Sequence, residues 1–194
     1  MKWLQDYPAT ICFVDGNHEN FDILNALPVV DFYGGKAHQV AENVFHLMRG
    51  EIYEIQGKTF LAFGGAVTGD YNLILRKDEY FKQNTKYCRK KGLTYRVLGE
   101  TYWPQECPTE EELNHAIKNV IDCKRQIDYV ITHDAPSFVV KNYLYQDNLT
   151  FANKILDTLQ NSFYCDKWFF GHHHRDKECN SVFTAVYNKI IKVI

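Results

Sequence analysis

Three apolar segments of the chain each end in a cluster of polar residues, and this repeated pattern constrains the fold more than any other feature. The segment at 10–15 leads into Gly16-Asn17-His18-Glu19, the segment at 127–132 into His133-Asp134, and the segment at 167–170 into Gly171-His172-His173-His174. Each apolar run is typical of a buried strand. Ligands of α/β folds collect at the carboxyl ends of strands, so we expect the three polar tips to face one another across a single site.

The length and composition of the chain bound the class of protein. Its 194 residues, of which 45% are hydrophobic, predict one globular domain spanning 1–194. A net charge of −2 predicts no general attraction to nucleic acid or to a membrane. The six cysteines lack paired spacing, which is typical of reduced thiols. Neither a signal peptide nor an apolar run long enough to span a membrane is found in the sequence, so we expect a cytoplasmic protein.

The periodicity of apolar residues predicts the remaining elements. A capping box over Thr109 to Glu112, followed by an apolar stripe, predicts an amphipathic helix from 109 to 121. The other expected elements are, in chain order, the end of a helix at 1–7, a short helix at 20–27, an antiparallel meander at 44–63, a helix at 152–159, and a strand pair at 182–186 and 190–194.

The stretch at 76–96 is strongly basic. It holds eight lysine or arginine residues and two acidic residues, a local charge of +6. Such a charge run is usually a solvated surface loop or a short helix. The alternative is a flap that attracts anions over a site.

The polar tips carry the side chains of a metal site. In extended backbone His172 and His174 project from the same side, while His173 points away. Together with the imidazole of His133 and the amide oxygen of Asn17, they form a mixed nitrogen and oxygen donor set. Such a set favours Mn, Fe or Zn over Ca or Mg.

Four further residues of the tips are expected to assist these ligands. His18 follows Asn17 directly and would lie beside the metal, where a general acid belongs. Asp15 or Glu19 could orient His18. We expect Asp15, Glu19 and Asp134 to support the ligands without binding the metal themselves. The remaining histidines, His38, His46 and His115, are expected to be surface or capping residues.

The three tips resemble the third, fourth and fifth motifs of the calcineurin-like metallophosphoesterases, in the same order. Gly64-Gly65-Ala66 and Trp103-Pro104-Gln105-Glu106 also look like features of small bacterial members. The resemblance implies a four-layer α/β/β/α sandwich with a dinuclear metal centre at its edge. It also implies that a metal-bound hydroxide hydrolyses a phosphate mono- or diester.

The resemblance assigns a role to each matching residue. Asn17, His133 and His172 match the ligands of one metal, and His174 matches a ligand of the other. His18 matches the histidine that protonates the leaving oxygen. The implied substrate is a small-molecule or protein phosphoester.

The sequence departs from the family pattern at its N-terminus. An Asp-x-His strand and a Gly-Asp-x-x-Asp turn should precede Pro8, and Gly69-Asp70 comes too late in the chain to replace that turn. We therefore expect an N-terminally truncated sandwich whose strand at 10–15 has an exposed edge that favours self-association. Because no carboxylate remains among the ligands, we expect at most one weakly held ion and impaired hydrolysis.

Two other functions compete with this hypothesis. One is a non-catalytic remnant or binding module that keeps the sandwich without the chemistry. The other is nuclease activity, which the acidic overall charge disfavours.

Overall fold

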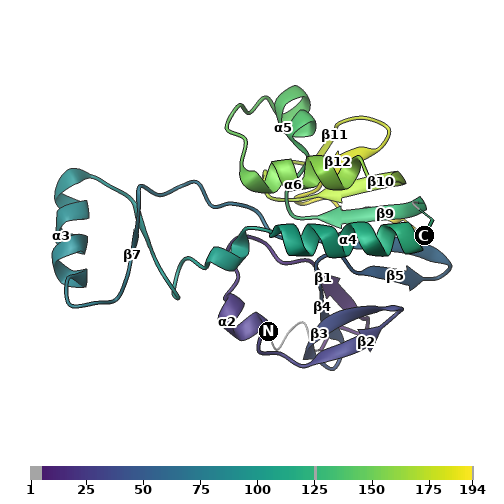
Figure 1. Cartoon of the computed structure of the whole chain (residues 1–194), viewed down its shortest axis with the longest axis horizontal. Helices are drawn as coiled ribbons and strands as arrows, with labels where there is room; N and C mark the ends of the chain where they lie inside the picture. Colours follow the sequence, from purple (N-terminus) through teal and green to yellow (C-terminus); the bar gives the residue numbers. More distant parts are fainter. Residues whose placement is uncertain (1–5, 125, 194) are drawn as a thin grey trace.

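The computed structural model describes residues 6–124 and 126–193. Two β-sheets form the body of the molecule, helices cover one of them, and an arm built from β7, α3 and β8 extends away from the body (Figure 1). None of the described helices is both long enough and apolar enough to cross a membrane.

The larger sheet has six strands in the order β11-β12-β10-β9-β6-β5. Its central strands β6, β9, β10 and β12 run parallel, so their carboxyl ends lie at one edge. The strand bounds are β5 Ile52–Ile55, β6 Lys58–Phe63, β9 Gln126–Thr132, β10 Tyr164–Phe170, β11 Lys177–Glu178 and β12 Phe183–Ala185.

The smaller sheet has four strands in the order β1-β4-β3-β2. Its strands are β1 Ile11–Phe13, β2 Val29–Phe32, β3 Gly35–Ala41 and β4 Val44–Leu47. β1 pairs with β4 in parallel and is the outermost strand of this sheet within the described residues. The self-association expected at this edge stays a prediction.

The alternation of side chains along β6 explains why the two sheets stack. Phe60 and Ala62 point toward the smaller sheet and pack with Phe32, Ala37 and Leu47. The intervening side chains of β6, Leu61 and Phe63, are fully buried against the helices on the opposite face. β6 is therefore buried on both faces, which is why it reads as a continuous apolar run.

Three helices, α4, α5 and α6, pack on the outer face of the larger sheet. α4 (Glu110–Asp122) begins with the predicted capping box between Thr109 and Glu112, and α6 (Phe151–Gln160) begins with a second one between Thr150 and Asn153. α5 (Ser137–Leu144) was not predicted, and it begins directly after Pro136.

The basic stretch forms most of the arm. α3 (Phe81–Lys91) is joined to the body through β7 (Leu73–Leu75) and β8 (Tyr95–Val97), which pair in parallel. The stretch at 76–96 thus contains a short helix whose surface is largely exposed to solvent. The chain returns to the body at the 3₁₀ turn Pro104–Glu106.

Several predicted elements are absent from the structure or are shorter than predicted. The segments at 44–63 do not form one meander, because β4 joins the smaller sheet while only β5 and β6 pair as a hairpin. No strand forms at 190–193, and β12 pairs instead with β10 and β11. The short helix is limited to α2 (Phe21–Leu24). Most of the helix expected at 1–7 lies outside the described residues, and Asp6 and Tyr7 are not helical.

The observed architecture is a mixed α/β sandwich, as the resemblance implied. Its three polar tips follow β1, β9 and β10, which come from both sheets. The sandwich therefore brings sequence-distant residues to one edge.

Candidate functional site

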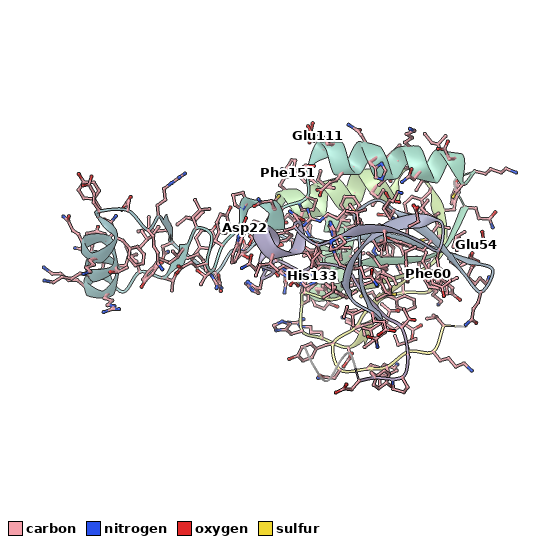
Figure 2. The ribbon with its side chains drawn as sticks, turned by 90° about the horizontal axis from the view of Figure 1, so that it is seen from below. Asp22, Glu54, Phe60, Glu111, His133 and Phe151 are labelled. Carbon is pink, nitrogen blue, oxygen red and sulfur yellow. The ribbon has the colours of Figure 1, made fainter. Side chains whose placement is uncertain are left out.

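The three polar tips meet at a cluster of nitrogen and oxygen donors. His133 Nε2 lies 3.0 Å from Asn17 Oδ1 and 3.3 Å from His172 Nδ1. Figure 2 shows His133 on the side of the body from which the arm projects, whereas Phe60 and Glu54 lie farther from the arm. We call Asn17, His133 and His172 the donor cluster.

A close approach of backbone to ring requires glycine before Asn17. A Cβ atom on Gly16 would lie 3.1 Å from His133 Cε1, which is tighter than nearly all real contacts of a Cβ atom. A larger residue at this position would require the imidazole of His133 to shift by a few tenths of an ångström. The glycine of the first tip therefore serves the histidine of the second.

The histidine triplet does not have the extended backbone from which its geometry was predicted. His172 and His174 have φ values of 61° and 50°, in the left-handed region. The prediction of extended backbone at His172 and His174 is therefore wrong, and alternation does not fix the directions of their side chains. His172 joins the donor cluster, whereas the exposed His174 stacks on Tyr187 with ring centroids 5.0 Å apart.

Asp134 holds the third tip in place from within the protein. Its carboxylate accepts hydrogen bonds from His173 Nε2 at 3.0 Å, from Asn153 Nδ2 at 2.8 Å and from the backbone N–H of Ala135 at 2.7 Å. Burial raises the pKa of Asp134, but the hydrogen bond from His173, the nearby His172 and the backbone N–H of Ala135 together outweigh it, and the pKa lies below its ordinary value. Asp134 thus ties the loop after β9 to the loop after β10.

Two residues that the sequence reasoning missed orient the amide of Asn17. Asn17 Nδ2 donates to Thr68 Oγ1 at 2.9 Å, and the backbone N–H and hydroxyl of Thr68 face the carboxylate of Glu106 at 2.6 and 2.9 Å. Because the amide nitrogen faces Thr68, the amide oxygen faces His133. Burial raises the pKa of Glu106. Its place in Trp103-Pro104-Gln105-Glu106 was the only signal for it in the sequence.

Asp15 belongs to a separate buried network rather than to the donor cluster. Its carboxylate accepts hydrogen bonds from Arg49 Nη2 at 2.5 Å and lies 3.1 Å from His46 Nε2, and Arg49 Nη1 donates to Glu112 at 3.0 Å. We call Asp15, His46, Arg49 and Glu112 the charged cluster. Burial raises the pKa of Asp15, and the hydrogen bonds from His46 and Arg49 lower it below its ordinary value.

The charged cluster corrects the interpretation of two histidines. His46 and His38 were expected at the surface, but both are buried and their rings stack with centroids 5.2 Å apart. A Cβ atom on Gly64 would lie 2.1 Å from Asp15 Oδ1, so the double glycine after β6 leaves room for this carboxylate. His115 is partly exposed and contacts Glu51, in line with the surface role expected for it.

His18 lies at the exposed rim of the donor cluster. Its Nε2 is 3.5 Å from Asn17 Nδ2, the limit of a hydrogen bond. Glu19 Oε1 instead accepts the backbone N–H of Gly16 at 3.3 Å, and Asp15 is engaged by Arg49. Within the described part of the chain, neither carboxylate is hydrogen-bonded to His18.

Burial keeps the histidines of the donor cluster uncharged at neutral pH. Desolvation, together with the neighbouring His172, lowers the pKa of His133 to about 4. Desolvation also lowers the pKa of His172. Neutral imidazoles retain the lone pairs that a metal ion requires.

The spacing of the donor cluster fits a single cation. Donor atoms bonded at about 2.1 Å to one ion lie about 3.0 to 3.4 Å apart, which matches the two distances at His133. The set contains no carboxylate. Within residues 6–124 and 126–193, no group of three or more His, Cys, Asp or Glu side chains is placed to hold a metal, and the ring of His174 stacks on Tyr187 instead of joining the donor cluster. The two distances at His133 therefore suit one ion, with a donor set that is only partly complete.

Comparison with known proteins identifies the family. The family model described as calcineurin-like phosphoesterase matches residues 1–176, which cover most of the chain. A search of curated proteins found no significant match. Members of this family generally bind divalent metals and hydrolyse phosphoesters. The chain belongs to the calcineurin-like phosphoesterases.

Proposed function

We propose that this chain hydrolyses a phosphate mono- or diester at the donor cluster. In this proposal Asn17, His133 and His172 hold one divalent ion, and His18 supplies a proton. The observation that carries the proposal is the convergence of three donor atoms from three separate tips within 3.3 Å of their neighbours. A bound divalent ion supplies Lewis-acid activation of the phosphoryl group and of an attacking water.

The protein's own task is to hold three neutral donors in place. Glu106 and Thr68 fix the amide of Asn17, and Gly16 leaves room for the imidazole of His133. Supporting contacts of this kind typically change metal affinity ten- to a hundredfold. Mn, Fe and Zn suit this mixture of imidazole and amide donors.

The donor inventory predicts weak binding and slow turnover. Three neutral ligands supply no negative charge to a divalent ion, and the described residues contain no group of three or more His, Cys, Asp or Glu side chains for a second ion. We therefore propose that the described residues bind at most one ion with low affinity, and that hydrolysis is impaired. The six free thiols support a reducing compartment such as the cytoplasm.

His18 is suited to protonate a leaving oxygen. It is exposed next to Asn17, so a bound phosphoester could place its leaving group within reach. General acid catalysis typically contributes about 10²- to 10⁴-fold, most of all for poor leaving groups. The substrate remains a small-molecule or protein phosphoester in this proposal.

The test is turnover of two phosphate esters in the presence of Mn²⁺, by the unchanged chain, His18→Ala and His115→Ala. His115 is the matched control because it is also a partly exposed histidine, but contacts Glu51 on α4. We expect His18→Ala to lose at least about tenfold on an alkyl phosphate and less on an aryl phosphate, with His115→Ala unchanged. Equal loss in both variants would contradict the role of His18.

The alternative of a binding module is favoured by one observation, the lack of a carboxylate in the donor cluster. It predicts that the chain takes up Mn²⁺ without any turnover above that of His133→Ala. Turnover that depends on both Mn²⁺ and His133 would exclude this alternative.

A further inference from the structure

The arm carries an unbalanced row of positive charge. Lys82, Lys86, Arg89 and Lys90 are all exposed on α3, and their spacing of four, seven and eight residues places them on one face of the helix. At 1.5 Å per residue they span about 12 Å. Figure 1 shows that α3 is the part of the arm farthest from the body.

These four cations have no acidic partners within the described residues. α3 contains no aspartate or glutamate. Two other cations of the arm do have acidic partners: Lys77 contacts Glu100, and Arg96 pairs with Asp70. Like charges four residues apart destabilise a helix slightly. The C-terminal end of the helix dipole favours Arg89 and Lys90, which lie in the last turn, but it supplies no counter-ion for the row. The row is therefore open to an anion.

Two tyrosines lie beside this row. Tyr80 directly precedes α3 and Tyr87 lies on it, seven residues later; their side chains are 55% and 53% exposed. The opposite side of α3 is anchored to the arm by Cys88, which is fully buried. The exposed side of the helix thus combines cations with aromatic rings. This combination is typical of surfaces that bind single-stranded nucleic acid through phosphate contacts and base stacking.

We propose that α3 binds single-stranded nucleic acid through Lys82, Lys86, Arg89 and Lys90, with Tyr80 and Tyr87 stacking on bases. A membrane partner is less favoured, because a helix lying on a bilayer buries a large apolar face, and the exposed face of α3 has none. An acidic protein would satisfy the cations but would give the exposed tyrosines no bases to stack on. The net charge of −2 argues against a general attraction of the whole chain to nucleic acid, so the proposed binding is local to α3, which contains no acidic residue, although Asp78 and Glu79 precede it.

The arm also joins the body beside the donor cluster. Thr68, at its base, is hydrogen-bonded to Asn17 at 2.9 Å. A flexible phosphodiester held by α3 could extend along the arm to that cluster. This last step rests on the proposed function, whereas binding by α3 does not.

The experiment measures fluorescence anisotropy of a labelled single strand of about 20 nucleotides with the metal-free chain, so that hydrolysis plays no part. Four phosphate contacts predict binding that weakens about 50-fold between about 50 and about 200 mM salt. Replacing Lys82, Lys86, Arg89 and Lys90 by glutamate should abolish most of this binding and its salt dependence. Tyr87→Ala should weaken binding about fivefold or more, because stacking contributes about 1–3 kcal/mol per base.

The matched control reverses four exposed lysines of the body, Lys118, Lys124, Lys141 and Lys154, and should leave binding nearly unchanged. Circular dichroism establishes that each variant is folded, and glutamine replacements at the same four α3 positions give a milder version of the test. Equal loss in the control and arm variants would overturn the proposal. So would binding to phosphatidylserine vesicles or polyglutamate as tight as binding to the single strand. Loss of nucleic-acid binding in the arm variant with unchanged turnover of a small aryl phosphate would support α3 as a separate surface.

Discussion

The donor cluster and the charged cluster begin two residues apart on the same tip, yet they are built in opposite ways. In the charged cluster Arg49 bridges Asp15 and Glu112, so buried charges of opposite sign are paired. In the donor cluster the side chains of Asn17, His133 and His172 are neutral, and the set itself includes no carboxylate. The charged cluster is therefore complete without a ligand, whereas the donor cluster presents lone pairs that a cation could use.

The largest effect is expected from breaking the charged cluster. Arg49→Met leaves the carboxylate of Asp15 buried without its main partner, and the free energy of unfolding should fall by about 3–5 kcal/mol. Urea unfolding measures this, with the exposed Arg76→Met of the arm as the matched control. A loss below about 1 kcal/mol in Arg49→Met would contradict the structural role of this cluster.

The donor cluster should instead make stability depend on pH. The folded-state pKa of His133 is about 4, below the ordinary value of 6.5. The unfolded chain therefore binds the proton first as the pH falls, so that stability is present above about pH 6.5 and is lost toward pH 4. For the metal-free chain this group alone predicts a decrease of about 2 kcal/mol between about pH 7 and about pH 5.

Urea unfolding at several pH values measures this dependence. His133→Gln should flatten the curve over this range, whereas His115→Gln should not. A curve that is equally steep in His133→Gln and in the unchanged chain would contradict the assignment of the pH dependence to the donor cluster.

The smallest effect sharpens the comparison within the donor cluster. Thr68→Val keeps the shape of the side chain but removes the hydroxyl that orients the amide of Asn17. We expect Mn²⁺ affinity to fall about tenfold, with stability reduced by only about 1 kcal/mol. Calorimetric titration measures the Mn²⁺ affinity of this variant and of the control Thr158→Val. Thr158 is an exposed residue of α6. Equal affinities in the two variants would remove Thr68 from the site.

Elements with a strong local signal could be predicted from the sequence. The capping box at Thr109 fixed the start of α4, and the apolar run before His133 identified β9. The meander at 44–63 was wrong because β4 and β5 have the same kind of pattern but belong to different sheets. Pairing between strands is set by packing across the sandwich, which local periodicity does not report.

The same limit applies to the site. The meeting of Asn17, His133 and His172 followed from a general rule about strand ends, and the described distances agree with it. The positive φ values at His172 and His174 could not be predicted, because non-glycine residues adopt them uncommonly and the sequence does not show at which positions. The burial of His46 against Asp15 likewise depends on a contact across 31 residues of sequence.

The most direct test of the donor cluster is the amount of Mn²⁺ retained after equilibrium dialysis, measured for the unchanged chain, His133→Ala and His115→Ala, each confirmed as folded by circular dichroism. The account predicts that the unchanged chain and His115→Ala take up about one weakly bound ion per chain and that His133→Ala takes up none, because three donors from three tips share that ion. Two tightly held ions in the unchanged chain, or undiminished uptake by His133→Ala, would contradict it.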